Sequence, residues 1–215
     1  MTPDALRYLS NRCSTMDRLI REHGNCTLVP DARRSPFESL VRAVAHQQLN
    51  GTAAESILRR FRALFPGRRF PRPVDLAAIS DDALRAAGFS RAKIAALRDI
   101  AEKTISGVIP ASRAIAKMGD EEIVARLTQV RGVGRWTVEM MLIFQLGRTD
   151  VWPVDDFGVR NGYRIAFDLP AMPSPKELFL LGERWRPHRT TAAWYLWRAA
   201  EAARKTRVVT GTGNS

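Results

Sequence analysis

The segment Leu127-Thr128-Gln129-Val130-Arg131-Gly132-Val133-Gly134-Arg135-Trp136-Thr137 is the part of this 215-residue chain that decides its fold class. Apolar residues at helical spacing precede and follow it, which indicates two helices joined by a short Gly-x-Gly turn, over about residues 123–146. The two glycines let an anion approach the main chain, and the N-terminus of the second helix favours negative charge. This pattern predicts a hairpin that binds the phosphates of nucleic acid without reading its sequence.

The charge of the whole chain agrees with a polyanionic partner. Thirty-four Lys and Arg residues stand against 22 Asp and Glu, which gives a formal net charge of +12 at pH 7. A basic helical protein with no nucleic-acid partner would show the same surplus, so charge alone identifies no ligand. Hydrophobic residues make up 45% of the chain, which predicts a globular domain rather than a disordered basic tail.

Several classes of protein are disfavoured by the sequence. No apolar run approaches the roughly 20 residues of a membrane span, and residues 1–12 lack the apolar core of a signal peptide. We therefore expect a cytoplasmic, DNA-associated protein with no membrane partner. Cys13 and Cys26 are too few for a disulfide framework, and the three histidines are scattered, so no metal site is expected. Nothing in the sequence demands more than a monomer.

The remaining periodicity is helical almost throughout, which predicts an all-α fold. Ser35 and Glu38 flank the start of one helix as a capping box, with Pro36 in its first turn. We expect one domain over residues 1–207 and a disordered polar tail over residues 208–215. The expected helices cover residues 4–22, 35–49, 52–65, 74–78, 81–87, 90–106, a stretch from 120, then 136–146, 155–166, 174–183 and 187–204.

With these elements in place, the chain resembles the base-excision DNA glycosylase superfamily, whose helix-hairpin-helix is similar to the segment quoted above. The resemblance covers roughly residues 35–200 and is strongest to the alkylation-repair branch, DNA-3-methyladenine glycosylase II. It implies two helical lobes flanking a cleft for DNA and base, without the N-terminal β-domain of longer relatives. The matching segments are Val44–Asn50, Leu84–Lys93, Leu127–Thr137, Val154–Val159, Glu183–Arg189 and Trp194–Trp197.

The resemblance implies that Asp156 is the catalytic carboxylate. Breaking an N-glycosidic bond builds positive charge on the sugar, which a fixed carboxylate stabilises while it orients or deprotonates water. An aspartate also commonly caps a helix, and we assign that role to the neighbouring Asp155. Bifunctional members carry a nucleophilic lysine where this chain has Trp136, so a monofunctional hydrolase without lyase activity is expected.

The resemblance also assigns residues to base and DNA binding. Trp136 and Trp197 match positions that line the pocket for an extruded base, where indole rings attract cationic alkylated purines. Met140 stands where some relatives have an aromatic residue, which makes this pocket more open. For Trp152, Trp185 and Trp194 we expect a place in the core instead. The expected DNA-binding residues are Gln48, Leu49, Gly132, Val133, Gly134, Arg135 and Thr137.

Either Gln48 or Leu49 is the candidate for a side chain inserted into the gap left by a flipped nucleotide, and packing at a helix end is the alternative for both. No cofactor is required by this chemistry. The resemblance further implies a structural monovalent cation held by the main-chain carbonyls of Thr128, Val130 and Val133.

The sequence thus predicts a monofunctional glycosylase that releases alkylated purines, of the 3-methyladenine type, from double-stranded DNA in base excision repair. One alternative is a glycosylase of the same superfamily for other damaged or mismatched bases. The other is a non-catalytic helix-hairpin-helix DNA-binding module, which would explain the glycines and the charge but not Asp156 at its spacing.

Overall fold

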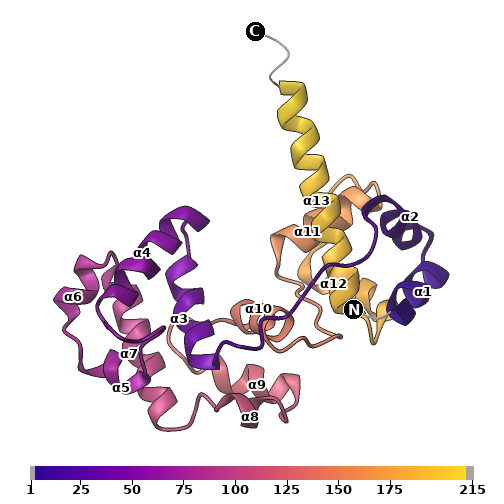
Figure 1. The fold of residues 1–215 in the computed structure, drawn as a ribbon. Helices are drawn as coiled ribbons and strands as arrows, with labels where there is room; N and C mark the ends of the chain where they lie inside the picture. The colour runs from indigo at the N-terminus through magenta and orange to yellow at the C-terminus, as the bar shows by residue number, and fades with distance from the viewer. Residues whose placement is uncertain (1–2, 212–215) are drawn as a thin grey trace. The chain divides into compact units, whose positions relative to one another are not determined.

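The computed structural model describes the backbone of residues 3–211 and the side chains of residues 3–205. Every regular element within that range is helical, which confirms the all-α prediction (Figure 1). The chain divides into two compact helical units. One is the continuous stretch Asp31–Met141, and the other combines the residues up to Pro30 with those from Leu142 onward.

The Asp31–Met141 unit is organised around α7, which contacts α3, α5 and α6. The apolar face of α7 is buried, and Leu97 and Ile100 at its centre are fully enclosed. The short helix α8 was not predicted from the sequence. The helices of this unit are α3 (Pro36–His46), α4 (Gly51–Ala63), α5 (Pro73–Ala78), α6 (Asp81–Ala86), α7 (Arg91–Ile105), α8 (Ser112–Ile115), α9 (Asp120–Leu127) and most of α10 (Arg135–Phe144).

Helix α3 departs from its prediction at both ends. Ser35 caps it as expected, with its hydroxyl accepting a hydrogen bond from the Glu38 amide at 3.1 Å. The Glu38 carboxylate does not complete a capping box, because it pairs with Arg42 at 3.0 Å and with Arg69 at 2.8 Å. The helix ends at His46 rather than near Leu49, so residues 47–50 form an exposed turn instead of a last helical turn.

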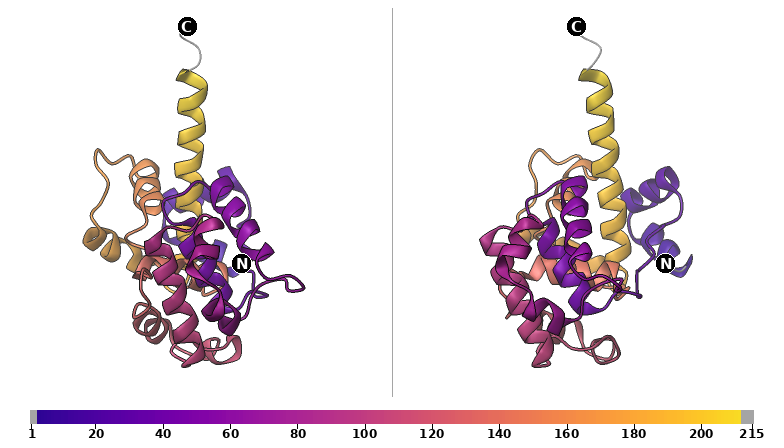
Figure 2. Two further views of the ribbon diagram at one scale, coloured as in Figure 1. Left: turned by 90° about the vertical axis from the view of Figure 1, so that its left-hand side faces the viewer. Right: turned by 60° about the vertical axis from the view of Figure 1, so that its left-hand side comes forward.

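The second unit is organised around α13, which contacts α11, α2 and α1. The predicted first helix is two helices, because Cys13 adopts an extended conformation between them. Figure 2 shows α13 as one uninterrupted helix, longer than predicted. The elements of this unit are α1 (Pro3–Arg12), α2 (Ser14–His23), α11 (Phe157–Ala166), α12 (Pro175–Gly182), a 3-10 turn (Glu183–Trp185) and α13 (Arg189–Gly211).

The C-terminal tail predicted for residues 208–215 is helical as far as Gly211, and its last four residues lie outside the part of the chain that is described. Helices α11 and α13 approach closely because Gly162 has no side chain. A Cβ at that position would lie 2.0 Å from the carbonyl oxygen of Leu196. Between residues 3 and 211, no helix is both long and apolar enough to cross a membrane.

Candidate functional site

The Asp156 carboxylate lies at the N-terminus of α11, where hydrogen bonds from α11 and from α13 hold it. Its Oδ1 atom accepts one from the Val159 amide at 2.8 Å and one from the indole Nε1 of Trp197, also at 2.8 Å. The partial positive charge at a helix N-terminus favours a carboxylate in this position. The structure therefore brings together two of the residues that the sequence assigned to the site, although they are 41 positions apart.

The cap of α11 was assigned to the wrong aspartate. Asp156 is the N-cap residue, with φ −71° and ψ 119°, and its side chain makes the capping hydrogen bond. Asp155 is exposed and precedes the cap. Because Oδ1 makes the capping bond, the capping role and the proposed catalytic role fall on the same residue.

Trp197 is half-buried and has an aromatic neighbour that the sequence did not reveal. The ring of Phe144, at the end of α10, stacks on the indole with a centroid separation of 5.5 Å and an angle of 27° between the planes. Phe144 is 44% exposed. Phe144 stands among other apolar residues at the end of this helix, so nothing in the sequence distinguished it from a core residue.

The loop that leads to Asp156 is fastened to the first turn of α13. Arg189 binds Asp150 through two nitrogens, at 2.8 and 3.0 Å, and also reaches Glu183 at 3.2 Å. The Thr190 hydroxyl donates to the Arg148 carbonyl and accepts a hydrogen bond from the Val151 amide. These contacts fix the same helix that carries Trp197, so the loop and the indole are held by one element.

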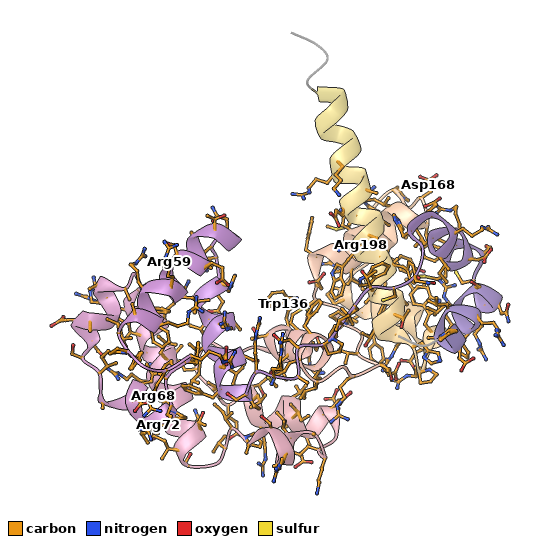
Figure 3. All side chains as sticks on the ribbon, viewed as in Figure 1. Arg59, Arg68, Arg72, Trp136, Asp168 and Arg198 are labelled. Atoms are coloured by element: carbon orange, nitrogen blue, oxygen red, sulfur yellow. The ribbon has the colours of Figure 1, made fainter. Side chains whose placement is uncertain are left out.

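The three tryptophans expected in the core are buried, which confirms that prediction. Trp152 donates its indole N–H to the Leu178 carbonyl at 2.8 Å. Trp185 is completely enclosed and packs edge-on against Trp152, with ring centroids 5.3 Å apart. Trp194 is buried, and the guanidinium of Arg198 lies 5.4 Å from its ring centroid. Arg198 lies on α13 (Figure 3).

The other two residues expected to line the base pocket belong to the Asp31–Met141 unit. Trp136 lies in the first turn of α10 and is 45% exposed, and Figure 3 shows its side chain at the start of that helix. Met140 is half-buried one turn further along. Trp136 and Phe144 are thus both exposed, near the two ends of a mostly apolar helix.

The hairpin between α9 and α10 turns on Gly132, whose φ of +75° is a conformation that favours glycine. The side chains of Val130 and Val133 point inward and are buried, and the Val133 amide donates to the Val130 carbonyl at 3.0 Å. Gly132 and Gly134 are exposed. The turn consequently presents main chain to solvent while its two valines anchor it in the core.

Two predicted DNA-binding residues of the hairpin are already engaged within the unit. The Arg135 guanidinium pairs with Glu121 of α9, at 2.6 and 3.0 Å. This pairing raises the pKa of Arg135, chiefly through the hydrogen bond to Glu121. Thr137 is buried, so a contact between DNA and its hydroxyl is disfavoured. Any contact at position 137 would use the main chain of the first turn of α10.

Helix α7 and the turn after α3 support the hairpin through residues that the sequence did not single out. The Asp99 carboxylate accepts a hydrogen bond from the Arg131 amide at 2.6 Å, and Lys103 donates to the Gln129 carbonyl at 2.6 Å. The Gln47 side-chain amide donates to the Gly132 carbonyl at 2.8 Å. An opposite-charge pair four residues apart is common on exposed helices, so the Asp99–Lys103 spacing was no signal by itself.

Gln48 and Leu49 lie in the turn between α3 and α4, and both are exposed. Gln48 has a φ of +58°, which is uncommon for a residue with a side chain and marks a sharp reversal of the chain. Asn50 then caps α4, with its side chain accepting a hydrogen bond from the Ala53 amide at 2.8 Å. Because Gln47 in the same turn bonds to Gly132, this turn is tied to the hairpin.

The side chains of the described residues form no cluster of three or more His, Cys, Asp or Glu residues suited to a metal ion. Main-chain oxygens are the remaining donors at the hairpin. Of the three carbonyls predicted to bind a monovalent cation, that of Val130 accepts the Val133 amide and keeps a second lone pair.

A family model described as HhH-GPD superfamily base excision DNA repair protein matches residues 41–187. The matched range includes the hairpin, the turn at Gln48 and Asp156, and it covers more than half of the chain. The chain therefore belongs to the HhH-GPD superfamily of base excision DNA repair proteins.

Individual proteins are similar to this chain over most of its length. DNA-3-methyladenine glycosylase 1 of Schizosaccharomyces pombe is 45% identical over 205 residues, which cover 94% of this chain and 89% of that protein. A crystallised 3-methyladenine DNA glycosylase of the same yeast, in complex with abasic DNA, matches with a TM-score of 0.82 and 43% identity, over 91% of this chain and 95% of its own. A DNA-3-methyladenine glycosidase of Bacillus halodurans matches with a TM-score of 0.84 and 31% identity, over 95% of this chain and 92% of its own.

Proposed function

We propose that this protein is a monofunctional DNA glycosylase that hydrolyses the N-glycosidic bond of alkylated purines, of the 3-methyladenine type, in double-stranded DNA. The proposal assigns it to the first step of base excision repair. Its relatives at 45% and 31% identity carry the names of 3-methyladenine enzymes and align over nearly the whole chain. The single observation that carries the chemistry is the Asp156 carboxylate held by the indole N–H of Trp197.

Asp156 would act on the sugar rather than on the base. As the bond to the base breaks, positive charge develops on the sugar ring, and a carboxylate already oriented beside it stabilises that charge without reorganising. The hydrogen bonds to Oδ1 hold the group in one orientation. A water molecule placed by the carboxylate then completes hydrolysis. A purine alkylated at N3 or N7 is already cationic and leaves readily, which reduces the need for a general acid.

The absence of lyase activity follows from Trp136, which stands at the position where bifunctional members have a lysine. An indole has no amine that could attack the sugar and form a Schiff base. Trp136 and Met140 are four residues apart on the same side of α10, and Trp136 is exposed enough to meet a planar base. We assign these two residues to base binding, and Trp197 likewise, because electron-rich rings favour a cationic purine.

The hairpin would bind the DNA backbone through the main chain of Gly132, Val133 and Gly134. The turn at Gln48 and Leu49 would supply the side chain that fills the gap left by the flipped nucleotide, since both residues are exposed beside the hairpin. The carbonyls of Thr128, Val130 and Val133 would hold a monovalent cation, which would add positive charge next to a bound phosphate.

The experiment is to incubate the protein with a methylated DNA duplex and to measure free purines in solution and the length of the strands. We expect release of methylated purines, with strands that stay intact until alkali is added. Strand cleavage without alkali would contradict the monofunctional assignment. Tight, salt-sensitive binding without base release would point to a non-catalytic module, and release of oxidised or mismatched bases only would point to another branch of the superfamily.

A further inference from the structure

Beneath the hairpin, α7 presents three residues in register with the turn. Ala96 packs under Gly132, where a Cβ added to the glycine would be 3.5 Å from the Ala96 Cβ. Asp99 and Lys103 follow at steps of three and four residues, which places all three on one face of the helix. That face therefore contacts the whole turn, from Gln129 to Gly132.

Of the two charged residues, one binds a main-chain amide of the turn and the other binds a main-chain carbonyl. Asp99 accepts the Arg131 amide at 2.6 Å through Oδ2, and Lys103 donates to the Gln129 carbonyl at 2.6 Å. They also bind each other, because Lys103 Nζ lies 2.8 and 2.9 Å from the two carboxylate oxygens. The Asp99–Lys103 ion pair thus holds the Gln129 carbonyl and the Arg131 amide, which belong to consecutive peptide groups of the turn.

Asp99 remains ionised in this position. Burial by itself raises its pKa, but the hydrogen bonds from Lys103 and from the Arg131 amide outweigh burial and hold the pKa below its usual value. A negative charge this close to a phosphate-binding turn should oppose DNA binding by simple Coulomb repulsion. Lys103 neutralises most of this charge. The remaining repulsion is small compared with the gain in DNA affinity from a correctly oriented turn.

We propose that Asp99 and Lys103 are positioning residues, which orient the hairpin main chain so that its amides meet a DNA phosphate. The inference rests on the proposed function only in that the hairpin binds DNA. Coulomb repulsion alone would make DNA bind more tightly when the negative charge of Asp99 is removed. A positioning role predicts the opposite, namely that removing this residue weakens DNA binding. Removing a negative charge elsewhere on α7 has no such effect.

The test measures the binding of an undamaged fluorescent duplex to the wild type and to Asp99→Ala, Asp99→Asn and Glu102→Ala. Glu102 is an exposed carboxylate on the same helix, so its variant matches the charge change of Asp99→Ala. We expect Asp99→Ala to bind roughly tenfold more weakly, the cost of losing a hydrogen bond to a charged group. Glu102→Ala should bind as tightly as the wild type or more tightly. Asp99→Asn keeps an oxygen for the Arg131 amide and should recover most of the affinity.

Two further readouts separate positioning from charge and from unfolding. The slope of log affinity against log salt should not change in Asp99→Ala, whereas loss of a direct cation–phosphate contact lowers it by about one. Hydrogen exchange at the Arg131 amide should accelerate in Asp99→Ala while the amides of α7 stay protected. If Asp99→Ala does not fold, Asp99→Asn and Lys103→Met test the same anchor. Exchange at the Arg131 amide should be faster in Asp99→Asn, whose neutral oxygen accepts more weakly, than in Lys103→Met, which keeps the carboxylate that accepts this amide.

Tighter or equal binding of Asp99→Ala, with Arg131 exchange unchanged, would overturn the inference. Failure of the wild type itself to bind DNA would instead overturn the proposed function, so the two failures are distinguishable.

Discussion

The hairpin at residues 128–134 and the Asp156 site differ in the chemical groups that they use and in the task proposed for each. The hairpin presents main-chain groups, and the buried side chains of Val130 and Val133 anchor it. The Asp156 site depends on one carboxylate, which the Val159 amide and the indole N–H of Trp197 from another helix orient. Binding any DNA backbone can use groups that every residue has, whereas bond cleavage needs one particular atom in one place. Substitutions should therefore separate affinity from chemistry.

The largest difference between the loss of base release and the loss of DNA affinity is expected for Asp156→Asn. Asparagine is as good an N-cap as aspartate and can still accept from Val159 and Trp197, so folding and DNA binding should persist. The rate of base release should fall by roughly 10²–10³-fold or more, as when a transition-state charge loses its partner. Single-turnover release from methylated DNA and a binding titration measure the two quantities.

Asp155→Asn is the matched control for that variant, because Asp155 is exposed and does not make the capping bond. It should release base at nearly the wild-type rate. Full activity in Asp156→Asn, or loss of activity in Asp155→Asn, would mean that the catalytic aspartate is misassigned.

Trp197→Phe should have the next largest effect. The phenyl ring can keep the stacking on Phe144 but cannot donate to Asp156. Loss of a hydrogen bond to a charged group costs about 1.5–3 kcal/mol, so the rate of base release should fall about tenfold to a hundredfold with little change in DNA affinity. Trp152→Phe is the control, because it loses an indole hydrogen bond to Leu178 and should lower the melting temperature without slowing chemistry in the folded protein. An unchanged rate in Trp197→Phe would show that its N–H does not orient the carboxylate.

The hairpin glycines should respond differently from each other and from the Asp156 site. Gly132→Ala places a side chain at φ +75° and should destabilise the fold by roughly 1–2 kcal/mol. Gly134→Ala has no neighbour within 4 Å and should leave the melting temperature unchanged. Its methyl group would face the bound phosphate and weaken DNA binding by roughly two- to tenfold, the worth of one ordinary hydrogen bond. Equal DNA affinity in Gly134→Ala would show that the phosphate does not approach that residue.

The smallest effect concerns the stability of the unit that carries Asp156. Burial raises the pKa of Tyr195 to about 12, and its hydroxyl donates to the Gly24 carbonyl at 2.8 Å. Because the folded state favours the protonated phenol, this contribution is present below the unfolded pKa of about 10 and is lost as pH rises toward 12. Chemical denaturation between pH 9 and 12 should show a steeper loss of stability in the wild type than in Tyr195→Phe. Equal slopes would show that Tyr195 does not govern the alkaline limit.

Much of the fold could be predicted because helix signals are local. Ser35, Asn50, Ser90 and Ser174 cap helices at or next to the expected starts, and the buried face of α7 follows from its spacing. One error occurred where a distant partner competed with a local one. The Glu38 carboxylate does not complete the capping box, because it forms an ion pair with Arg69, 31 residues away. Cys13 divides the first predicted helix at a point where the apolar spacing continues unbroken.

The sequence by itself determined the helical class, the glycine hairpin, the surplus of positive charge and the presence of an aspartate pair before α11. Each of these depends on residue types or on spacings of a few residues. Only the tertiary structure decided that Asp156 rather than Asp155 caps the helix, that Trp197 donates to it under Phe144, and that Asp99 and Lys103 hold the hairpin. Apart from the cap of α11, these contacts join residues from 26 to more than 50 positions apart, and the packing of whole helices, not any local periodicity, sets which of them meet.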